Sequence, residues 1–210
     1  MISNRPVAPN KGKSYPAEPL TPAEITALIG QCSPKAPTGI RNRALLTLIY
    51  RSGLRISEVL ALRPSDVNLA RHTVRLLDTK SGKPQTRGFH PSADDALCRW
   101  LDMRRELAAR GGWKNGKLFC TLDGTPVSDD YVRVLLRRLG AKAGIDKRIH
   151  PHGLRHTFAV ELDASGMSVT AISKLLGHSS IAVTARYLDH LTNAQAVEAL
   201  EQTELPALGA

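Results

Sequence analysis

The sequence predicts a mainly α-helical domain with a small antiparallel β-sheet, an α+β fold. Apolar residues recur at helical spacing over most of the chain after residue 20, and Ser, Thr, Gly and Pro mark the helix ends. Between residues 67 and 90 the pattern changes to short, strand-like segments separated by turn residues. The length of 210 residues, 42% of them hydrophobic and 23% charged, suits one domain with a sizeable core.

The first helix begins at a capping box. Residues 1–20 are rich in Pro and basic residues, and we expect them to form a flexible basic arm. Thr21 and Glu24 have the capping-box spacing, with Pro22 at the first helical position. The pattern predicts a helix that ends near Ile29 and buries Ile25 and Leu28.

Two further helices precede the strand-like region. Apolar residues at helical spacing predict a helix over about 39–52 that stops at Gly53. A third helix, over about 56–62, is expected to end before Pro64.

Three short strands and then more helices are expected after residue 66. The strands are Val67–Leu69, His72–Thr79 and Thr86–His90, with Ser81 and Gly82 in the turn between the last two. One expected helix opens at Ser92–Asp95 and ends at Gly111-Gly112, and the next runs from Ser128 through Leu139. The remainder of the chain is expected to be helical with stops at Gly166 and Gly177, and its last helix covers Asn193–Gln202.

The net charge of +10 favours a polyanionic partner, most often nucleic acid. Aromatic residues make up only 4% and do not alternate with basic ones, so double-stranded DNA is a better expectation than a single strand. The cysteines (Cys32, Cys98, Cys120) have neither disulfide nor zinc spacing, which favours a reducing cytoplasm. No apolar run is long enough to span a membrane, and we expect no membrane partner.

Two segments supply candidate phosphate ligands. Arg55 in SGLRISE lies near a helix N-terminus, with Glu58 three residues on; the alternative is an exposed surface pair. His152 and Arg155 in HGLRH share a helix face, and an arginine fork matches phosphate. His150 and His156 make metal binding a rival, but no carboxylate or thiolate lies at ligand spacing, so we expect neither metal nor cofactor; a simple histidine helix cap is the third interpretation.

The remaining candidates follow the same chemistry. Lys80 lies at the tip of the expected hairpin, where Lys83 competes for the role. His178 follows Gly177, and Tyr187 comes nine residues later. Several cations around one phosphate and a phenolic nucleophile suit the cutting and rejoining of a phosphodiester through a covalent phosphotyrosine. Two alternatives stay open: Tyr187 as an interfacial core residue, and residues 169–187 as a helix-turn-helix.

The chain resembles the tyrosine recombinases of the phage integrase family over nearly all of residues 20–190. The matching pieces are LTPAEI, SGLRISEVLAL, the Lys80 hairpin, HPHGLRHTFA, LLGHSS and ARYLDH. The resemblance implies that Tyr187 is the nucleophile and that Arg55, Arg155 and His178 bind the scissile phosphate. It also implies that His152 is the acid/base histidine, that Lys80 protonates the leaving 5′ hydroxyl, and that Glu58 is a supporting carboxylate.

The resemblance divides the chain into an arm (1–20), a catalytic domain (21–190) and a C-terminal helix or tail (191–210). The tail packs either in cis or on a neighbouring subunit. Most members carry a DNA-clamping domain before the catalytic one, whereas here the catalytic pattern begins almost at once. We therefore expect a naturally minimal recombinase or an excised catalytic domain, with salt-sensitive DNA binding.

The first hypothesis is a site-specific DNA recombinase of the cytoplasm and nucleoid that acts as a tetramer on paired sites and is a monomer or oligomer when free. The second is a non-catalytic DNA-binding regulator, and the third is a type IB topoisomerase-like DNA relaxer.

Overall fold

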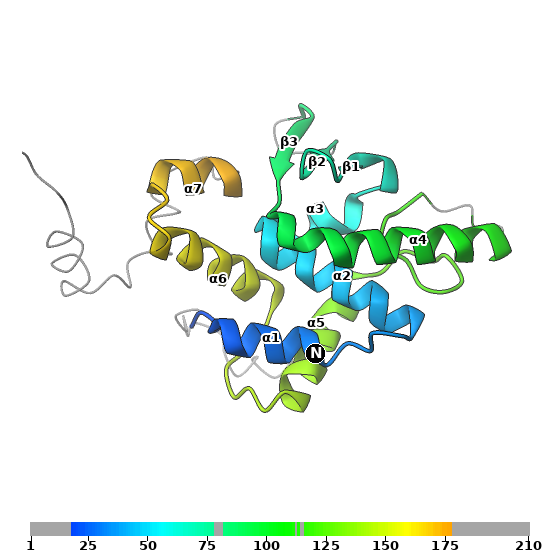
Figure 1. The fold of residues 1–210 in the computed structure, drawn as a ribbon, viewed down its shortest axis with the longest axis horizontal. Coiled ribbons are helices and arrows are strands. Elements are labelled where there is room, and N and C mark those ends of the chain that lie inside the picture. Colours follow the sequence, from blue (N-terminus) through cyan, green and yellow to red (C-terminus); the bar gives the residue numbers. More distant parts are fainter. Residues whose placement is uncertain (1–17, 78–81, 112, 114–115, 178–210) are drawn as a thin grey trace, which may run out of the picture.

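A computed structural model describes residues 18–77, 82–111, 113 and 116–177 (Figure 1). The described helices and strands confirm the predicted class, since helices dominate and one small sheet is antiparallel. The helices are α1 (Pro22–Gly30), α2 (Pro37–Ser52), α3 (Ile56–Ala61), α4 (Asp94–Gly111), α5 (Asp129–Lys142), α6 (Pro151–Ala164) and α7 (Val169–Leu176). The strands are β1 (Val67–Asn68), β2 (Thr73–Leu76) and β3 (Gln85–Gly88), and two 3-10 turns are η1 (Pro64–Asp66) and η2 (Pro91–Ala93).

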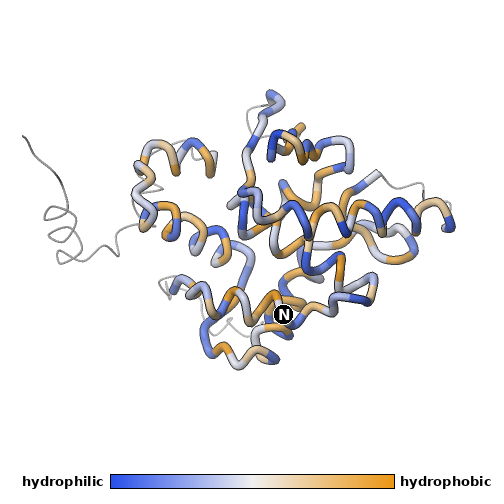
Figure 2. Tube along the Cα trace, viewed as in Figure 1, coloured by the Kyte–Doolittle hydropathy of each residue, from blue (hydrophilic) through white to orange (hydrophobic). Residues whose placement is uncertain are grey.

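Helix α2 is the centre of the fold. It packs against α4 and α6, and also against α1 and α3. Leu45, Leu46, Leu48 and Ile49 are all fully buried although they point in different directions around the helix axis. A helix that is buried over most of its surface must be enclosed by other elements. The enclosing α4 shows hydrophobic and hydrophilic stretches in alternation along its trace, as expected of a helix with one buried side (Figure 2).

The predicted helix ends are confirmed in detail. Thr21 Oγ1 accepts from the Glu24 backbone N–H at 3.2 Å, and the Glu24 carboxylate accepts from the Thr21 N–H at 2.7 Å. Gly53 and Gly177, the C-caps of α2 and α7, have φ of 59° and 65°. Only glycine adopts this left-handed conformation without strain, which is why these helices stop where the sequence predicts.

The strands are shorter than predicted. His72, the expected first residue of the second strand, has φ of 52° and is a turn residue, so β2 begins at Thr73. The third strand ends at Gly88, because the N–H of His90 donates to the Arg51 carbonyl at 2.8 Å instead of to the sheet. The sheet order is β1-β2-β3, with Val74 opposite both Val67 and Arg87. The expected helix over 193–202 lies outside the described residues.

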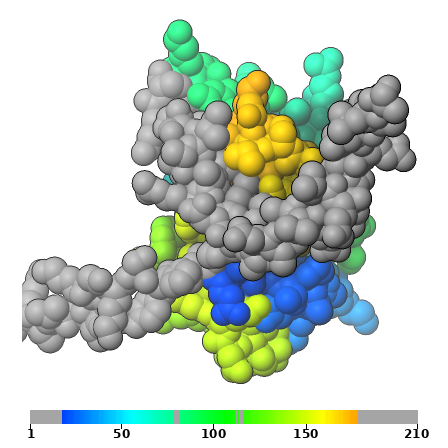
Figure 3. Space-filling model, turned by 90° about the vertical axis from the view of Figure 1, so that its left-hand side faces the viewer, coloured from blue at the N-terminus to red at the C-terminus, as the bar shows by residue number. Residues whose placement is uncertain are grey.

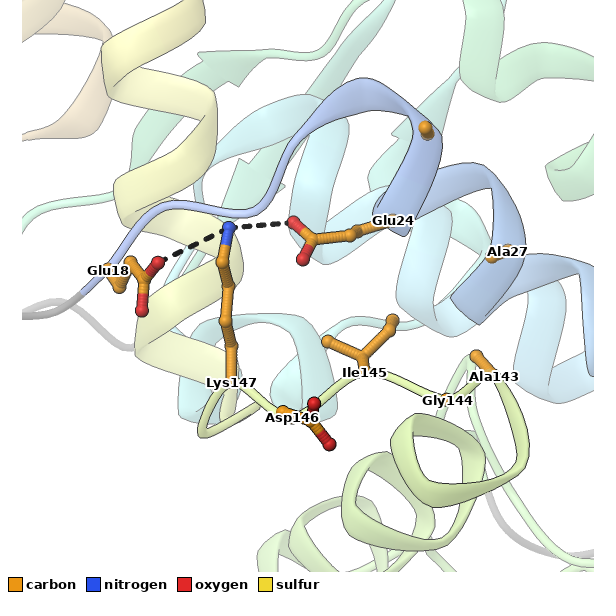
Figure 4. Close-up of a pocket in the computed structure, with 9 residues that line it drawn as sticks. Glu18, Glu24, Ala27, Ala143, Gly144, Ile145, Asp146 and Lys147 are labelled. Carbon is orange, nitrogen blue, oxygen red and sulfur yellow. Dashed lines mark hydrogen bonds and ion pairs between the residues drawn. The ribbon is translucent and has the colours of Figure 1, made fainter.

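The segment that leads into α1 is fixed to the α5–α6 side of the molecule. Leu20 is buried, and its N–H donates to Thr157 Oγ1 on α6 at 3.0 Å. Lys147 Nζ donates to the Glu24 carboxylate at 2.9 Å and lies 3.5 Å from the Glu18 carboxylate (Figure 4). On the face seen in Figure 3, α1 lies directly above α5 and below α7. Among the described residues, no helix combines the length and the apolar character needed to cross a bilayer.

Candidate active site

Four of the predicted site residues lie in the described part of the chain: Arg55, Glu58, His152 and Arg155. The other three, Lys80, His178 and Tyr187, lie outside the described residues, so their roles stay predictions. Lys83, the rival of Lys80, is described and exposed.

Arg55 is held in place by Glu58. Arg55 is the N-cap of α3, with φ −68° and ψ 146°. One carboxylate oxygen of Glu58 accepts from the Arg55 backbone N–H at 2.8 Å, and the other accepts from Arg55 Nη1 at 2.8 Å. Glu58 thus caps the helix and orients the guanidinium, while 42% of the Arg55 side chain remains accessible. Such a pair presents a positioned cation instead of a freely rotating one.

Arg155 is the buried arginine of the candidate site. It lies in the second turn of α6 and is only 2% exposed. Its Nη1 donates to the carbonyl of Gly53, the C-cap of α2, and its Nη2 donates to the carbonyl of Leu176 at 2.8 Å. One guanidinium therefore holds the C-terminal ends of α2 and α7 against α6, where helix carbonyls favour a cation.

Three predicted residues meet in one cavity. A cavity of about 260 Å³ opens where α3, α5 and the start of α6 come together. It is lined by Leu54, Arg55, Ile56, Ser57, Arg133, His150, Pro151, His152 and Arg155. Arg55, His152 and Arg155 come from segments about a hundred residues apart, so their convergence is a result of the fold and not of local spacing.

The cavity disfavours the protonated form of His152. Desolvation lowers the pKa of His152 below its ordinary value of 6.5, and the charges of Arg155 and then Arg55 lower it further. The imidazole is therefore neutral at neutral pH, and a neutral imidazole is able to accept or relay a proton.

His150 is the helix cap that the sequence left open as an interpretation. Its Nδ1 accepts from the Gly153 N–H at 3.1 Å, and its ring stacks on that of His152 with centroids 6.3 Å apart. Within residues 18–177, apart from the undescribed gaps, no group of His, Cys, Asp and Glu side chains has the arrangement of a metal site.

Two arginines near the site were missed by the sequence motifs. Arg133 on α5 lines the cavity. Arg87 on β3 lies over Gly177, since a Cβ added to this glycine would be 2.2 Å from Arg87 Nη2. Periodicity assigns Arg133 to the exposed side of α5 but says nothing of which helix it faces. No sequence signal connects Arg87 to the end of α7.

Comparison with known proteins gives a consistent result. Residues 18–194 match the model of the phage integrase family. Tyrosine recombinase XerC of Bacillus pumilus is 36% identical over 181 residues, which is 85% of this chain and 59% of that protein. Tyrosine recombinase XerD of Ralstonia nicotianae is 36% identical over 168 residues, 80% of this chain and 54% of that protein. The chain thus spans a little over half the length of these relatives.

Solved structures share the fold. The crystal structure of XerA recombinase has a TM-score of 0.75 at 28% identity and covers 89% of this chain and 66% of that chain. XerH site-specific recombinase, bound to a palindromic difH substrate after cleavage, has a TM-score of 0.73 at 26% identity and covers 90% of this chain and 54% of that chain.

Proposed function

Because this chain belongs to the phage integrase family, we propose that it is a site-specific recombinase that cuts and rejoins duplex DNA through Tyr187. Family membership confirms the resemblance that the motifs predict. The observation that supports the activity best is the cavity that Arg55, His152 and Arg155 line together.

The proposed reaction exchanges one phosphate ester for another. The Tyr187 hydroxyl gives its proton to His152, its oxygen attacks the scissile phosphorus, the bond to the 5′ oxygen breaks, and a 3′-phosphotyrosine forms. Lys80 gives its proton to the departing 5′ oxygen, which leaves as a hydroxyl. Rejoining is the reverse: a 5′ hydroxyl gives its proton to Lys80 and attacks the phosphotyrosine, and Tyr187 departs and takes its proton back from His152. Each step replaces one phosphate ester bond by another, so rejoining needs no energy from an added nucleotide.

The basic residues have complementary proposed roles. Arg55, Arg155 and His178 stabilise the charge that gathers on the non-bridging oxygens in the transition state. Glu58 keeps Arg55 oriented, which its hydrogen bonds to both the backbone and the side chain of Arg55 support. His152 acts as the acid/base histidine, and the lowered pKa of its ring supports this role.

We further propose double-stranded DNA as the partner, because the chain is basic and the similar XerH is seen bound to its difH substrate. Strand exchange then takes place in a tetramer on two paired sites, in the cytoplasm and on nucleoid DNA.

Covalent trapping on a nicked suicide duplex tests the activity. The duplex is first identified by mapping where the wild-type protein attaches in the DNA that flanks its own gene. We expect Tyr187→Phe to abolish the covalent complex while DNA binding persists. Tyr131→Phe is the matched control, since the Tyr131 hydroxyl bonds to Asn42 away from the cavity, and this variant should still be trapped. A covalent complex formed by Tyr187→Phe would refute the assignment.

A supercoiled plasmid with and without that site separates the rival functions. Recombinant products support the recombinase, and relaxation without site preference supports a topoisomerase-like relaxer. Unchanged DNA, with binding intact, supports a DNA-binding regulator.

A further inference from the structure

Arg133 brings a cation to the cavity from a third direction. Arg55 is the N-cap of α3, His152 and Arg155 lie on α6, and Arg133 lies on α5. Helix α5 packs against both α3 and α6, which places Arg133 on the wall beside the residues proposed to bind the scissile phosphate.

In the present structure Arg133 is paired with a carboxylate on its own helix. Its Nη2 donates to Asp129 Oδ2 at 2.8 Å, one helical turn away, and 53% of the Arg133 side chain is exposed. Asp129 lies in the first turn of α5, where the free N–H groups of the helix also stabilise a carboxylate. Ion pairs this exposed are weak, so a phosphate that arrives in the cavity can compete for the guanidinium.

Three arginines line the cavity together: Arg55, Arg155 and Arg133. The stacked rings of His150 and His152 belong to the same lining. Arg133 is close enough to His150 to contribute, after desolvation, Arg148 and His152, to the lowering of the pKa of that histidine. A DNA backbone that brings one phosphate to Arg55 and Arg155 meets the charge of Arg133 along the same wall.

We propose that Arg133 binds a DNA backbone phosphate adjacent to the scissile one, and that it exchanges Asp129 for that phosphate when the duplex binds. Asp129 is then a built-in competitor that weakens DNA binding. The proposal rests on the proposed function for the location of the scissile phosphate, but the binding of the second phosphate is measured without strand cleavage.

The test is the salt dependence of DNA binding by the full chain, with a short fluorescent duplex of arbitrary sequence as the probe. Each phosphate contact contributes a slope of about −0.9 to log K against log salt concentration. We expect Arg133→Ala to reduce the slope by about one such contact and to weaken binding evenly across sequences. Arg133→Lys keeps the charge and should keep most of the slope.

A double-mutant cycle tests the exchange with Asp129. Asp129→Asn should raise affinity about two- to fivefold where Arg133 is present, since the competing carboxylate is gone. In the Arg133→Ala background the gain should shrink to the small increase expected from removing any one negative charge.

The matched control is the pair Glu106 and Arg110 on α4, which has the same spacing and also exposed side chains. The C-terminal end of α4 lies at the opposite side of the molecule from α6 (Figure 1). Glu106→Gln and Arg110→Ala should therefore act additively on DNA affinity, with no coupling.

Two results would overturn the proposal: an unchanged salt slope in Arg133→Ala, or an Asp129→Asn gain that is equal in both backgrounds. Thermal unfolding of each variant identifies a loss of fold, in which case Arg133→Gln, which also removes the charge, replaces Arg133→Ala in both experiments. Failure of the recombinase assignment is seen separately, as the absence of a wild-type covalent complex. If Arg133→Ala keeps the wild-type salt slope while the wild-type protein forms its covalent complex, only the role of Arg133 is refuted.

Discussion

The two ends of α2 each hold a buried arginine, and the two arginines differ in what surrounds them. Arg41 lies in the second turn of α2, and Arg155 reaches from α6 to Gly53 at the other end; each is only 2% exposed. Arg155 lines the cavity, and Arg41 is not among the residues that line it.

Arg41 is enclosed by neutral acceptors. Its Nε and Nη2 donate to Asn42 Oδ1 at 3.0 and 2.8 Å, and its Nη1 donates to the Cys120 carbonyl at 3.2 Å. Its guanidinium also bonds to the Tyr131 hydroxyl and lies 4.9 Å from the centre of that ring. These partners come from α2 itself, from α5 and from the backbone at Cys120, so this end of α2 is a packed polar cluster.

The comparison teaches that burial of an arginine does not by itself indicate function. Both guanidiniums anchor helix α2 through carbonyl or amide oxygens, and both are costly to remove. Only Arg155 combines this anchoring with an opening that Arg55 and His152 share. Access to a cavity shared with other candidate residues, and not the degree of burial, separates a candidate phosphate ligand from a structural arginine.

The largest expected difference is in strand cleavage. We expect Arg155→Lys to slow formation of the covalent complex by about 10²–10³, because a lysine cannot bond to two helix-end carbonyls and a phosphate together. Arg41→Lys should lower the free energy of unfolding but leave the cleavage rate near that of the wild type. Single-turnover cleavage below both unfolding temperatures measures the two rates. Equal losses in both variants would remove the distinction between the two ends of α2.

The glycine at the Arg155 end provides a second difference. Gly53 has φ of 59°, and an added Cβ would lie 2.5 Å from Leu176 Cδ2 and 2.8 Å from Phe158 Cδ1. Gly166 has φ of 84° with no atom near an added Cβ, so Gly166→Ala costs only the left-handed strain of about 1–2 kcal/mol. Gly53→Ala should cost roughly 1–3 kcal/mol more, because Leu176 and Phe158 are buried. Urea unfolding of the two variants measures this difference. Equal midpoints would show that α7 moves away from the added methyl group at little cost in stability.

Much of this architecture can be predicted from the sequence, because its signals are local. The Thr21–Glu24 capping box and the glycine at position 53 fix helix ends through contacts within a few residues. The strand limits were missed because they depend on His72 in a left-handed conformation and on a bond from His90 to α2.

Part of the candidate site could likewise be predicted from local motifs, and part of it could not. Arg55, His152 and Arg155 stand in motifs with recognisable residue types, and the fold brings them into one cavity. Arg133 stands in no motif, and its place on the cavity wall follows only from the packing of α5 against α3 and α6. The assignments of Lys80, His178 and Tyr187 concern residues outside the described part of the chain and stay predictions.

The smallest expected difference is electrostatic, and it concerns the titration of His152. Its pKa is lowered by desolvation, by Arg155 and by Arg55, so the unfolded chain takes up a proton at this position more readily than the folded protein. Stability should therefore fall as the pH drops through 6.5 toward the lower folded-state pKa, and His152→Gln should remove this component of the pH dependence. We expect Arg55→Gln to raise the pKa of His152, since one nearby positive charge is lost, whereas Arg41→Gln at the other end of α2 leaves the pKa as it is. NMR titration of the imidazole protons measures both variants. An equal response to the two substitutions would mean that the charge on His152 is governed by the net charge of the protein and not by the cavity.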